Sequence, residues 1–543
     1  MRIALAFSGG GYRASAFNLG VITYLNRVSV DGATLLDKVT ALSTVSGGTI
    51  TGAKYALGIK KGETLEEIYA SLYRFFLNTD LISGSIERLC STENWDQPRV
   101  KSLISAFADL YDDLLFQKDK FGVLLDEKHP IHLKHISFNA TEFSTGLQFR
   151  FQVSEKIFSP ITGIPYDGII GNFNNNISGK VAKDIRMADI LAASSCFPGG
   201  FEPINFPTDF VLPDTDEIIR LRKNKKYPIG LMDGGIVDNQ GIEPLLLAEN
   251  RMRLNSLNPD QCNFDLIIVS DVSSPYMEGF TASIQQKENW WRRLTLQRVK
   301  LVTFFTVLVA AGLMVLAIRE KSIVLSVTAT ILFTLSSIVA LLFLWIKKQL
   351  KNIGILDVSK LKKFRHLKLI VFENLLKNRV LSILRLTGSV FMKHIRRLNF
   401  RSVYENDYWA NRRIMNAIYE LRAGEKNTEK RFEKGELDDY LKPSAKIQEV
   451  SSIAAGMETT LWFEKRHWDA RVPDSLIACG QYSICWNLLG YIGQIKRDTT
   501  NTNKNHQLLL SCEDFLRKDW EKFKENPYWL VEKYQQEMSL LSK

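Results

Sequence analysis

The chain has 543 residues, of which 45% are hydrophobic and 24% are charged. This is enough apolar material for a sizeable core, and it excludes a wholly disordered chain. Six scattered cysteines do not form a disulfide framework, so we expect reduced thiols in a reducing compartment. The formal net charge of +11 would suit an anionic lipid or a nucleic acid as partner, depending on where the excess lies.

Residues 1–275 alternate short apolar runs with helical patterns, which is typical of an α/β fold. The pattern begins at residue 2 without a signal-peptide core or cleavage site, so we expect that the front of the protein is not secreted. Residues 402–543 are predicted to be mostly helical, with an exposed, charged loop at 425–434. The predicted helices of the first part are 13–27 and 47–58, and its strands are 2–7, 39–45, 131–139, 147–153 and 265–269.

Two segments have no charged residue, 301–318 over 18 positions and 322–346 over 25 positions. A membrane span needs about 20 apolar residues, whereas a buried helix of a soluble protein rarely runs so long without a polar side chain. We therefore predict a two-helix transmembrane hairpin at 301–346, after a lead-in segment at 276–300, rather than two buried helices. The cations on both flanks predict a multi-pass protein with both long ends on the cytoplasmic side; they are Arg292, Arg293, Arg298, Lys300, Lys347, Lys348 and Lys351.

Residues 347–401 contain 15 lysines and arginines against 2 acidic residues. This segment therefore carries the whole positive excess, and apolar residues recur between its cations. A basic amphipathic segment beside a membrane span is expected to bind anionic lipid headgroups. The alternative is a solvated helical face. Nucleic acid is not expected as a partner, because no recognition motif accompanies the charge.

A glycine cluster follows the first predicted strand, in Ser8-Gly9-Gly10-Gly11-Tyr12-Arg13-Ala14. Consecutive glycines let backbone N–H groups converge on a phosphate or an oxyanion, and the following helix adds its positive end. The same spacing resembles a dinucleotide fingerprint, which requires an acidic residue at the end of the second strand. That strand ends at Ser46 instead, so we expect no dinucleotide cofactor.

A serine stands at a predicted strand-to-helix junction in Ser43-Thr44-Val45-Ser46-Gly47-Gly48-Thr49. Small residues after the serine are typical of a nucleophile elbow, which exposes the hydroxyl above the sheet. The alternative is an ordinary serine at a helix N-cap.

An aspartate follows an apolar run in Met232-Asp233-Gly234-Gly235-Ile236-Val237-Asp238-Asn239. Such a residue can be held by a tight turn and aimed at a cleft. Taken alone, however, an Asp-Gly pair is more readily explained by an Asx-turn.

In this order on an α/β scaffold, the three motifs resemble the patatin-like phospholipase family. Asn139-Ala140-Thr141-Glu142 and Ala192-Ala193-Ser194-Ser195-Cys196-Phe197-Pro198 add to a resemblance that covers about residues 1–275. A fainter similarity at 476–482 corresponds to the helix that closes the patatin domain. The resemblance implies a three-layer αβα sandwich that residues 402–490 complete, with the hairpin and the basic segment inserted into it and a helical C-terminal region at 402–543.

The resemblance also implies a catalytic Ser46–Asp233 dyad. Ser46 would attack an acyl ester, and Asp233 would act as base and then activate water. The backbone N–H groups of Gly9, Gly10 and Gly11 would form the oxyanion hole. The supporting residues would be Arg13, Gly47, Gly48, Gly234 and Gly235.

Histidine and cysteine spacing predicts no metal site. His132 and His135 are three apart, so on a strand they would face opposite sides. Four histidines follow Asp233 in the chain, so a Ser-Asp-His triad stays open as an alternative to the dyad. No cofactor or calcium dependence is expected.

The leading hypothesis is a membrane-anchored acyl hydrolase, of phospholipase A or lysophospholipase type, that acts on phospholipid. The alternatives are a non-catalytic lipid-binding scaffold and a lipid acyltransferase that uses the same acyl-enzyme. A membrane-bound lipase endangers its own cell, which suggests control by homo-oligomerisation or by an activating partner.

Overall fold

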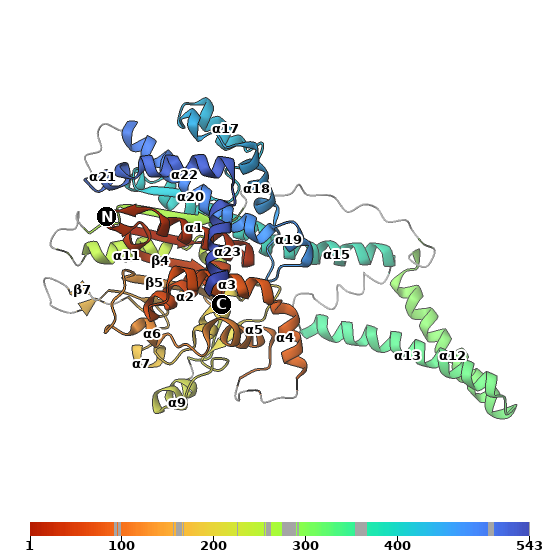
Figure 1. Cartoon of the computed structure of the whole chain (residues 1–543). Helices are drawn as coiled ribbons and strands as arrows, with labels where there is room; N and C mark the ends of the chain where they lie inside the picture. Colours follow the sequence, from red (N-terminus) through yellow and green to blue (C-terminus); the bar gives the residue numbers. More distant parts are fainter. Residues whose placement is uncertain are drawn as a thin grey trace. The chain divides into compact units, whose positions relative to one another are not determined.

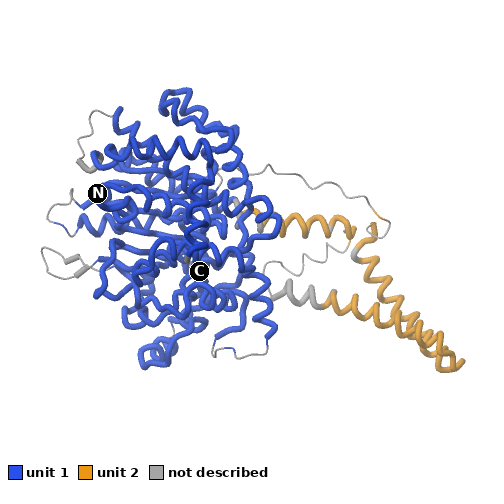
Figure 2. Tube along the Cα trace, in the orientation of Figure 1, with its two compact units in different colours: residues 1–277, 387–543 blue, residues 278–386 orange. Residues whose placement is uncertain are grey.

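The chain forms two compact units, one of residues 1–277 and 387–543 and the other of residues 278–386 (Figure 2). The polypeptide therefore leaves the first unit after residue 277 and returns to it at residue 387. The computed structural model describes the chain except for residues 92–94, 96–98, 156, 159–164, 167, 225, 255, 257–261, 274–288, 290–292, 353–365, 367, 498–503 and 542–543.

The first unit is built on an eight-stranded mixed sheet in the order β12-β11-β1-β4-β5-β10-β9, with β6 paired to β5. The pairs from β12 to β5 are parallel, whereas β6 and β10 on β5 and β9 on β10 are antiparallel. The strands are β1 Ile3–Phe7, β4 Val39–Val45, β5 His135–Glu142, β6 Leu147–Val153, β9 Ile204–Phe206, β10 Ile229–Asp233, β11 Leu266–Asp271 and β12 Arg413–Ala417.

Helices surround this sheet, and two short hairpins, β2–β3 (Ser29–Val30 with Ala33–Thr34) and β7–β8 (Ile157–Phe158 with Pro165–Tyr166), lie outside it. The α-helices of this unit are α1 Gly11–Arg27, α2 Gly47–Lys61, α3 Leu65–Asn78, α4 Leu81–Cys90, α5 Leu103–Tyr111, α6 Gly122–Leu125, α7 Gly179–Ala182, α8 Met187–Ser195, α9 Asp216–Lys223, α10 Gly235–Asp238, α11 Glu243–Leu254, α16 Met392–Tyr404, α17 Lys426–Glu433, α18 Ala445–Gly456, α19 Lys465–Asp469, α20 Val472–Arg497, α21 Lys504–Ser511, α22 Glu513–Glu525 and α23 Trp529–Leu541.

Strand β5 places β4 and β10 end to end. Val45, the last residue of β4, pairs with Asn139, and Asp233, the last residue of β10, pairs with Ala140. Since β6 occupies the other edge of β5 throughout, β4 and β10 share one edge and approach from opposite directions. The residues at their carboxyl ends therefore meet at adjacent positions of β5.

Side chains of the central strands alternate between two hydrophobic clusters, as the two-residue period of a strand requires. In β1, Leu5 belongs to the cluster beneath α1, α2 and α20, and Ala6 belongs to the cluster beneath α11 and α16. Both clusters are buried, so the sheet has helices on both faces. This is the three-layer αβα arrangement predicted from the sequence.

Helices α1 and α20 lie side by side although one is near the start of the chain and the other is near its end (Figure 1). They cross at two glycines. A Cβ atom on Gly20 would lie 2.0 Å from the carbonyl oxygen of Ile477, and one on Gly480 would lie 2.0 Å from that of Phe17. Backbone therefore packs directly on backbone, which fixes the C-terminal region on the core of the first unit.

Three expectations from the sequence need correction. The strand predicted at 131–139 begins only at His135 and continues to Glu142, since its pairing with β6 and β10 extends that far. The loop predicted at 425–434 is helix α17, and the buried Thr428 donates a hydrogen bond to the carbonyl oxygen of Glu420 at 2.7 Å.

The third correction concerns the end of the basic segment at 347–401. Arg396 in α16 is buried and forms an ion pair with Asp271 at 2.7 Å. This cation is therefore part of the first unit and does not face a lipid surface.

The second unit contains α12 Leu296–Arg319, α13 Ile323–Asn352 and α15 Leu369–Arg385. Within α12 and α13, Gln297–Arg319 and Ile323–Leu342 are long and apolar enough to cross a membrane, and most of their side chains are exposed. They are candidate membrane spans by length and composition. Most of the predicted lead-in segment at 276–300 lies outside the described residues, as do 353–365 of the basic segment.

The substitution Gly480→Ala should destabilise the first unit, because the new methyl group would meet a backbone oxygen that cannot move aside cheaply. Overpacking of this kind costs up to about 3 kcal/mol, which exceeds the gain of about 1 kcal/mol in helix propensity. Gly456→Ala at the end of α18 is the matched control, since a Cβ atom there has no neighbour within 4 Å. Thermal unfolding in detergent should show a lower Tm for Gly480→Ala only. Equal Tm values would refute the close crossing.

Candidate active site

Ser46 is the single residue between the end of β4 and the start of α2. Its backbone has φ 51° and ψ −123°, a conformation that costs energy for any residue with a side chain. Two glycines make this turn feasible: a Cβ atom on Gly47 would lie 2.0 Å from the carbonyl oxygen of Gly11, and one on Gly48 would lie 2.7 Å from that of Ser8. The geometry is that of a nucleophile elbow, with the serine side chain held at the N-terminus of α2.

Asp233 ends β10 and is almost completely buried, with 3% of its surface exposed. The backbone N–H of Gly235 donates a hydrogen bond to Oδ1 at 2.7 Å, so the Asx-turn considered from the sequence is present. Ser46 faces the same cavity as this carboxylate. Burial raises the pKa of Asp233 to about 6, and the nearby Ser46 side chain and the Gly235 N–H partly oppose this rise.

The glycine loop lies beside Ser46. Gly10 and Gly11 have φ values of 148° and 58°, which favour glycine, and a Cβ atom on Gly11 would lie 2.3 Å from the carbonyl oxygen of Thr460. Among the residues that the structure describes, the N–H groups of Gly10 and Gly11 have no hydrogen-bond acceptor.

The N–H group of Gly9 does not point to an open acceptor position, in contrast to the oxyanion-hole role predicted from the sequence. Its N–H donates to the carbonyl oxygen of Asn239 at 3.0 Å, so this donor is already engaged. Its lack of a side chain has another role, because a Cβ atom there would lie 3.2 Å from Ser46 Cβ and 2.5 Å from Asn239 Oδ1.

Ser194, at the end of α8, links the nucleophile turn to β5. Its hydroxyl accepts a hydrogen bond from the Ser46 N–H at 3.0 Å and donates one to the carbonyl oxygen of Asn139 at 2.7 Å. Asn139 in turn donates to Ser43 Oγ and to the carbonyl oxygen of Thr44, both at 2.9 Å. The motifs around 139–142 and 192–198 therefore hold the turn in place, a role that the sequence did not specify.

Asn239 links the glycine loop to the turn after Asp233. Its carbonyl accepts from Gly9, its Nδ2 donates to Ser273 Oγ at 2.9 Å, and a Cβ atom on Gly235 would lie 2.6 Å from its Oδ1. Gly234 is similarly close to β5, since a Cβ atom there would lie 2.4 Å from the carbonyl oxygen of Asn139. Asn239 belongs to the sequence motif around Asp233, but its contacts with the glycine loop follow only from the fold.

Ser46 and Asp233 line a common cavity of about 520 Å³ within the first unit. Gly9, Gly10, Gly11 and Arg13 line it as well. The remaining described lining residues are Ser195, Phe197, Phe201, Asn239 and Ser273, then Met392, Lys393 and Arg396 of α16, then Thr459, Thr460, Leu461 and Trp462. Sequence reasoning did not connect α16 or residues 459–462 with the site.

Arg13 holds one wall of this cavity to the glycine loop. Its guanidinium donates to the carbonyl oxygen of Met457 at 2.7 Å and to Thr459 Oγ1 at 3.2 Å. The N–H of the neighbouring Tyr12 donates to the carbonyl oxygen of Thr460 at 2.8 Å. The segment Met457–Trp462 is thereby fastened across the start of α1.

Among the described residues, no histidine lines the cavity. His132 is paired with the Tyr55 hydroxyl at 2.9 Å, and His135 is buried, which lowers its pKa to about 3. In the described part of the chain no group of three His, Cys, Asp or Glu residues has the arrangement of a metal site. The six cysteines are free.

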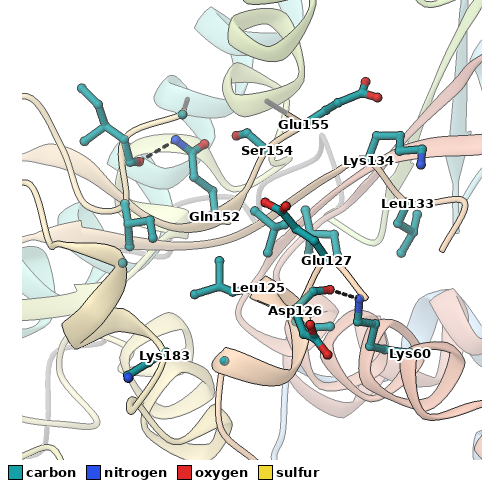
Figure 3. Close-up of a pocket in the computed structure, with 18 of the residues that line it drawn as sticks. Lys60, Leu125, Asp126, Glu127, Leu133, Lys134, Gln152, Ser154, Glu155 and Lys183 are labelled. Carbon is teal, nitrogen blue, oxygen red and sulfur yellow. Dashed lines mark hydrogen bonds between the residues drawn. The ribbon is translucent and has the colours of Figure 1, made fainter. Parts of the chain in front are cut away.

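A second cavity of about 1090 Å³ lies by the residues that lead into β5 (Figure 3). It is separate from the Ser46 cavity, since the strands that carry Ser46 and Asp233 end opposite Asn139 and Ala140. Lys60, Lys134 and Lys183 line it together with Asp126 and Glu127. The Lys60 ammonium group donates a hydrogen bond to the carbonyl oxygen of Asp126. Its walls therefore carry both signs of charge.

Residues 5–246 match the family model described as Patatin-like phospholipase. This match supports a patatin-like phospholipase domain in this part of the chain, and the members of that family are lipid acyl hydrolases as a class. The match contains both Ser46 and Asp233 and ends before β11. No curated protein matches the chain.

Replacing the buried carboxylate should stabilise the protein near neutral pH. Raising the pKa of Asp233 from 3.8 to about 6 means that the folded state binds its proton more tightly than the unfolded state does. Ionisation therefore destabilises the fold by on the order of 3 kcal/mol above pH 6, and this effect disappears below pH 4. Asp233→Asn should have a higher Tm than the wild type at pH 7.5 and a smaller advantage at pH 4.5, measured by thermal unfolding. A lower Tm at pH 7.5 would contradict this assignment.

Proposed function

We propose that this protein is a serine acyl hydrolase of phospholipase A or lysophospholipase type that uses Ser46 as nucleophile and Asp233 as base. The observation that carries the proposal is that Ser46 and Asp233 line one cavity beside the glycine loop, at the ends of two strands that pair with adjacent residues of β5. The match of residues 5–246 to a family of lipid acyl hydrolases supports the reaction class.

In the first half of the reaction, Ser46 Oγ attacks the ester carbonyl while its proton passes to Asp233. The carbonyl oxygen becomes an oxyanion, and the N–H groups of Gly10 and Gly11 are the donors that we assign to it. Donors of this kind are worth about 3 kcal/mol each in the transition state. When the C–O bond breaks, the proton on Asp233 passes to the leaving alkoxide, and the acyl group stays on Ser46.

In the second half, Asp233 takes a proton from water, and the resulting hydroxide attacks the acyl-enzyme. The same glycine N–H groups hold the second oxyanion. Collapse of this intermediate releases the fatty acid and returns the proton to Ser46 Oγ. A base with a pKa of about 6 is mostly ionised at neutral pH and is still a better proton acceptor than an ordinary carboxylate.

The cavity has apolar walls as well as a reactive centre. Phe197 and Phe201 lie on one segment, and Leu461 and Trp462 lie on another. Walls of this kind suit the acyl chain of a lipid, because burying its methylene groups is favourable by about 0.8 kcal/mol each. This is why we assign a long-chain ester as substrate.

The candidate spans of the second unit would tether the enzyme to its substrate. Cations on both flanks of these helices support the placement of the first unit on the cytoplasmic side. The exposed cations Lys377 and Arg379 on α15 would add an attraction to anionic headgroups. A tethered enzyme searches a surface instead of a volume, which raises the effective substrate concentration.

Ser46→Ala and Asp233→Ala should each lower the release of fatty acid from phospholipid vesicles by at least a thousandfold, because each removes a group that takes part in bond making. The assay uses the full-length protein, solubilised in detergent and added to the vesicles. A metal chelator is present, because no calcium dependence is expected. Ser452→Ala is the matched control, since this serine is exposed on α18 and its hydroxyl donates a hydrogen bond to the carbonyl oxygen of Gln448 in the same helix. It should retain wild-type activity.

Equal release by the wild type and both variants would overturn the dyad. Adding lysophospholipid or glycerol to the same assay distinguishes an acyltransferase, which would form transfer products in place of free fatty acid. Wild-type protein that binds vesicles but releases no fatty acid would favour the scaffold alternative.

The pH profile should report on Asp233. The base must be ionised, so kcat/KM should rise with pH through a midpoint at about 6 and then level off. A neutral ester substrate is required, so that no substrate group titrates in this range. Intrinsic fluorescence across the same pH range controls for acid unfolding. A profile that stays flat down to pH 4.5 would exclude Asp233 as the base.

A further inference from the structure

Apolar side chains are exposed where the chain turns from β5 into β6. Phe143 directly follows β5, and Leu147 begins β6 opposite the last residue of β5, Glu142. Phe143 is 60% exposed and Leu147 is 39% exposed. Folding gains nothing from apolar side chains that stay in water, so a group of them on one surface indicates contact with a membrane or another molecule.

A third exposed apolar side chain, Phe173, is fastened to the same hairpin. Glu142 is buried, and its Oε2 accepts hydrogen bonds from Asn172 Nδ2 at 2.6 Å and from Asn175 Nδ2 at 2.9 Å. The N–H groups of residues 174 and 175 donate to Asn172 Oδ1 and close the turn. This turn leaves Phe173 90% exposed. We call Phe143, Leu147 and Phe173 the hairpin patch.

The hairpin patch lies beyond the edge of the sheet that carries Ser46. Strands β4 and β5 are parallel, and Val45 pairs with Asn139. Ser46 is therefore level with Ala140, and β5 continues past this level to Glu142. A strand rises about 3.3 Å per residue, so Phe143 projects about 10 Å beyond the level of Ser46.

The chain leaves the first unit and returns to it at this same edge. Ser273 follows β11, which runs parallel to β1 as β1 does to β4, and it lines the Ser46 cavity. Met392, the first residue of α16, lines the cavity as well. The candidate spans Gln297–Arg319 and Ile323–Leu342 lie between these two residues in the chain. The edge beyond which the hairpin patch lies is thus the edge that the chain connects to its candidate spans.

A cation lies beside the hairpin patch. Lys226 is exposed, and its ammonium group donates to the carbonyl oxygen of Asn174 in the turn that carries Phe173. The carboxylate of this turn, Glu142, is buried and bonded to two amide groups. Exposed aromatic side chains with a cation beside them suit the interface of an anionic lipid layer.

We propose that the hairpin patch inserts into the phospholipid surface that the candidate spans enter. Phe143, Leu147 and Phe173 lie among the headgroups and the first methylene groups, and Lys226 contacts anionic headgroups. This contact turns the edge that carries Ser46 towards the lipid. The occupant is a lipid surface, and not a second copy of this chain, because the chain connects this same edge to its candidate spans. The inference concerns lipid contact by the first unit, so it does not require Ser46 to be catalytic.

Photochemical capture of lipid tests this contact. The full-length protein carries benzoylphenylalanine in place of Phe173 and is reconstituted in vesicles of phosphatidylcholine and phosphatidylglycerol in equal amounts. Illumination should attach radiolabelled phosphatidylcholine to this position at least about tenfold more than to position 254, because an inserted side chain touches acyl chains.

Leu254 is the matched control position, since it is 70% exposed and ends α11 at the opposite edge of the sheet. Glu249 of the same helix accepts a hydrogen bond from the Phe264 N–H at 2.8 Å, just before β11 begins. Equal capture of lipid at the two positions would overturn the inference. So would capture of a second copy of the chain, or of another protein, at position 173 in place of lipid.

Phe173→Asp tests whether the hairpin patch inserts as one surface. With benzoylphenylalanine at position 143, this substitution should lower lipid capture by at least about fivefold, because a carboxylate resists transfer out of water. The Tm should not change, since Phe173 is exposed. Leu254→Asp places the same charge at the opposite edge and should leave capture at position 143 unchanged.

Equal capture at position 143 in the wild-type background and in Phe173→Asp would overturn insertion of the hairpin patch. These measurements also separate the inference from the catalytic proposal. A wild-type protein that captures lipid at position 173 but releases no fatty acid would contradict the catalytic proposal alone. Release of fatty acid without capture at position 173 would contradict the hairpin patch alone.

Discussion

One edge of β5 is shared by two strands that run towards each other, and the candidate site depends on this arrangement. Val45 pairs with Asn139 and Asp233 pairs with Ala140, so a serine that follows one strand lies next to an aspartate that ends the other. The two residues are far apart in the sequence. Their approach therefore requires no flexible loop, because adjacent backbone positions of one strand hold both ends.

Close backbone packing further fixes the positions of Ser46 and Asp233. Gly47 lies against Gly11, Gly48 against Ser8, and Gly234 against Asn139, at distances that leave no room for a Cβ atom. The strained backbone of Ser46 is tolerated because these contacts surround it, and because Ser194 bonds its N–H. Sites that must hold reacting groups within a fraction of an ångström are commonly fastened in this way, by a second layer of hydrogen bonds and tight packing.

The walls of the cavity come from parts of the chain that flank the second unit. Ser273 precedes it, and α16 follows it. The Ser46–Asp233 pair and the glycine loop thus lie within the part matched by the family model, whereas Lys393, Arg396 and Thr459–Trp462 lie outside it. The cavity is therefore completed by parts of the chain that lie beyond the matched residues.

The sequence by itself determined the α/β class, the strand at 39–45, the two apolar helices, and the three motifs around Ser46, Asp233 and the glycine loop. These features depend on local periodicity and on glycines at sharp turns, which a linear pattern records. Tertiary structure alone decided that Gly9 donates to Asn239, that Ser194 holds the Ser46 N–H, and that Arg396 pairs with Asp271 instead of facing lipid. It also decided that 425–434 contains a helix packed on Glu420. Each of these outcomes depends on partners distant in the chain or on burial of a polar group, and neither is visible in residue spacing.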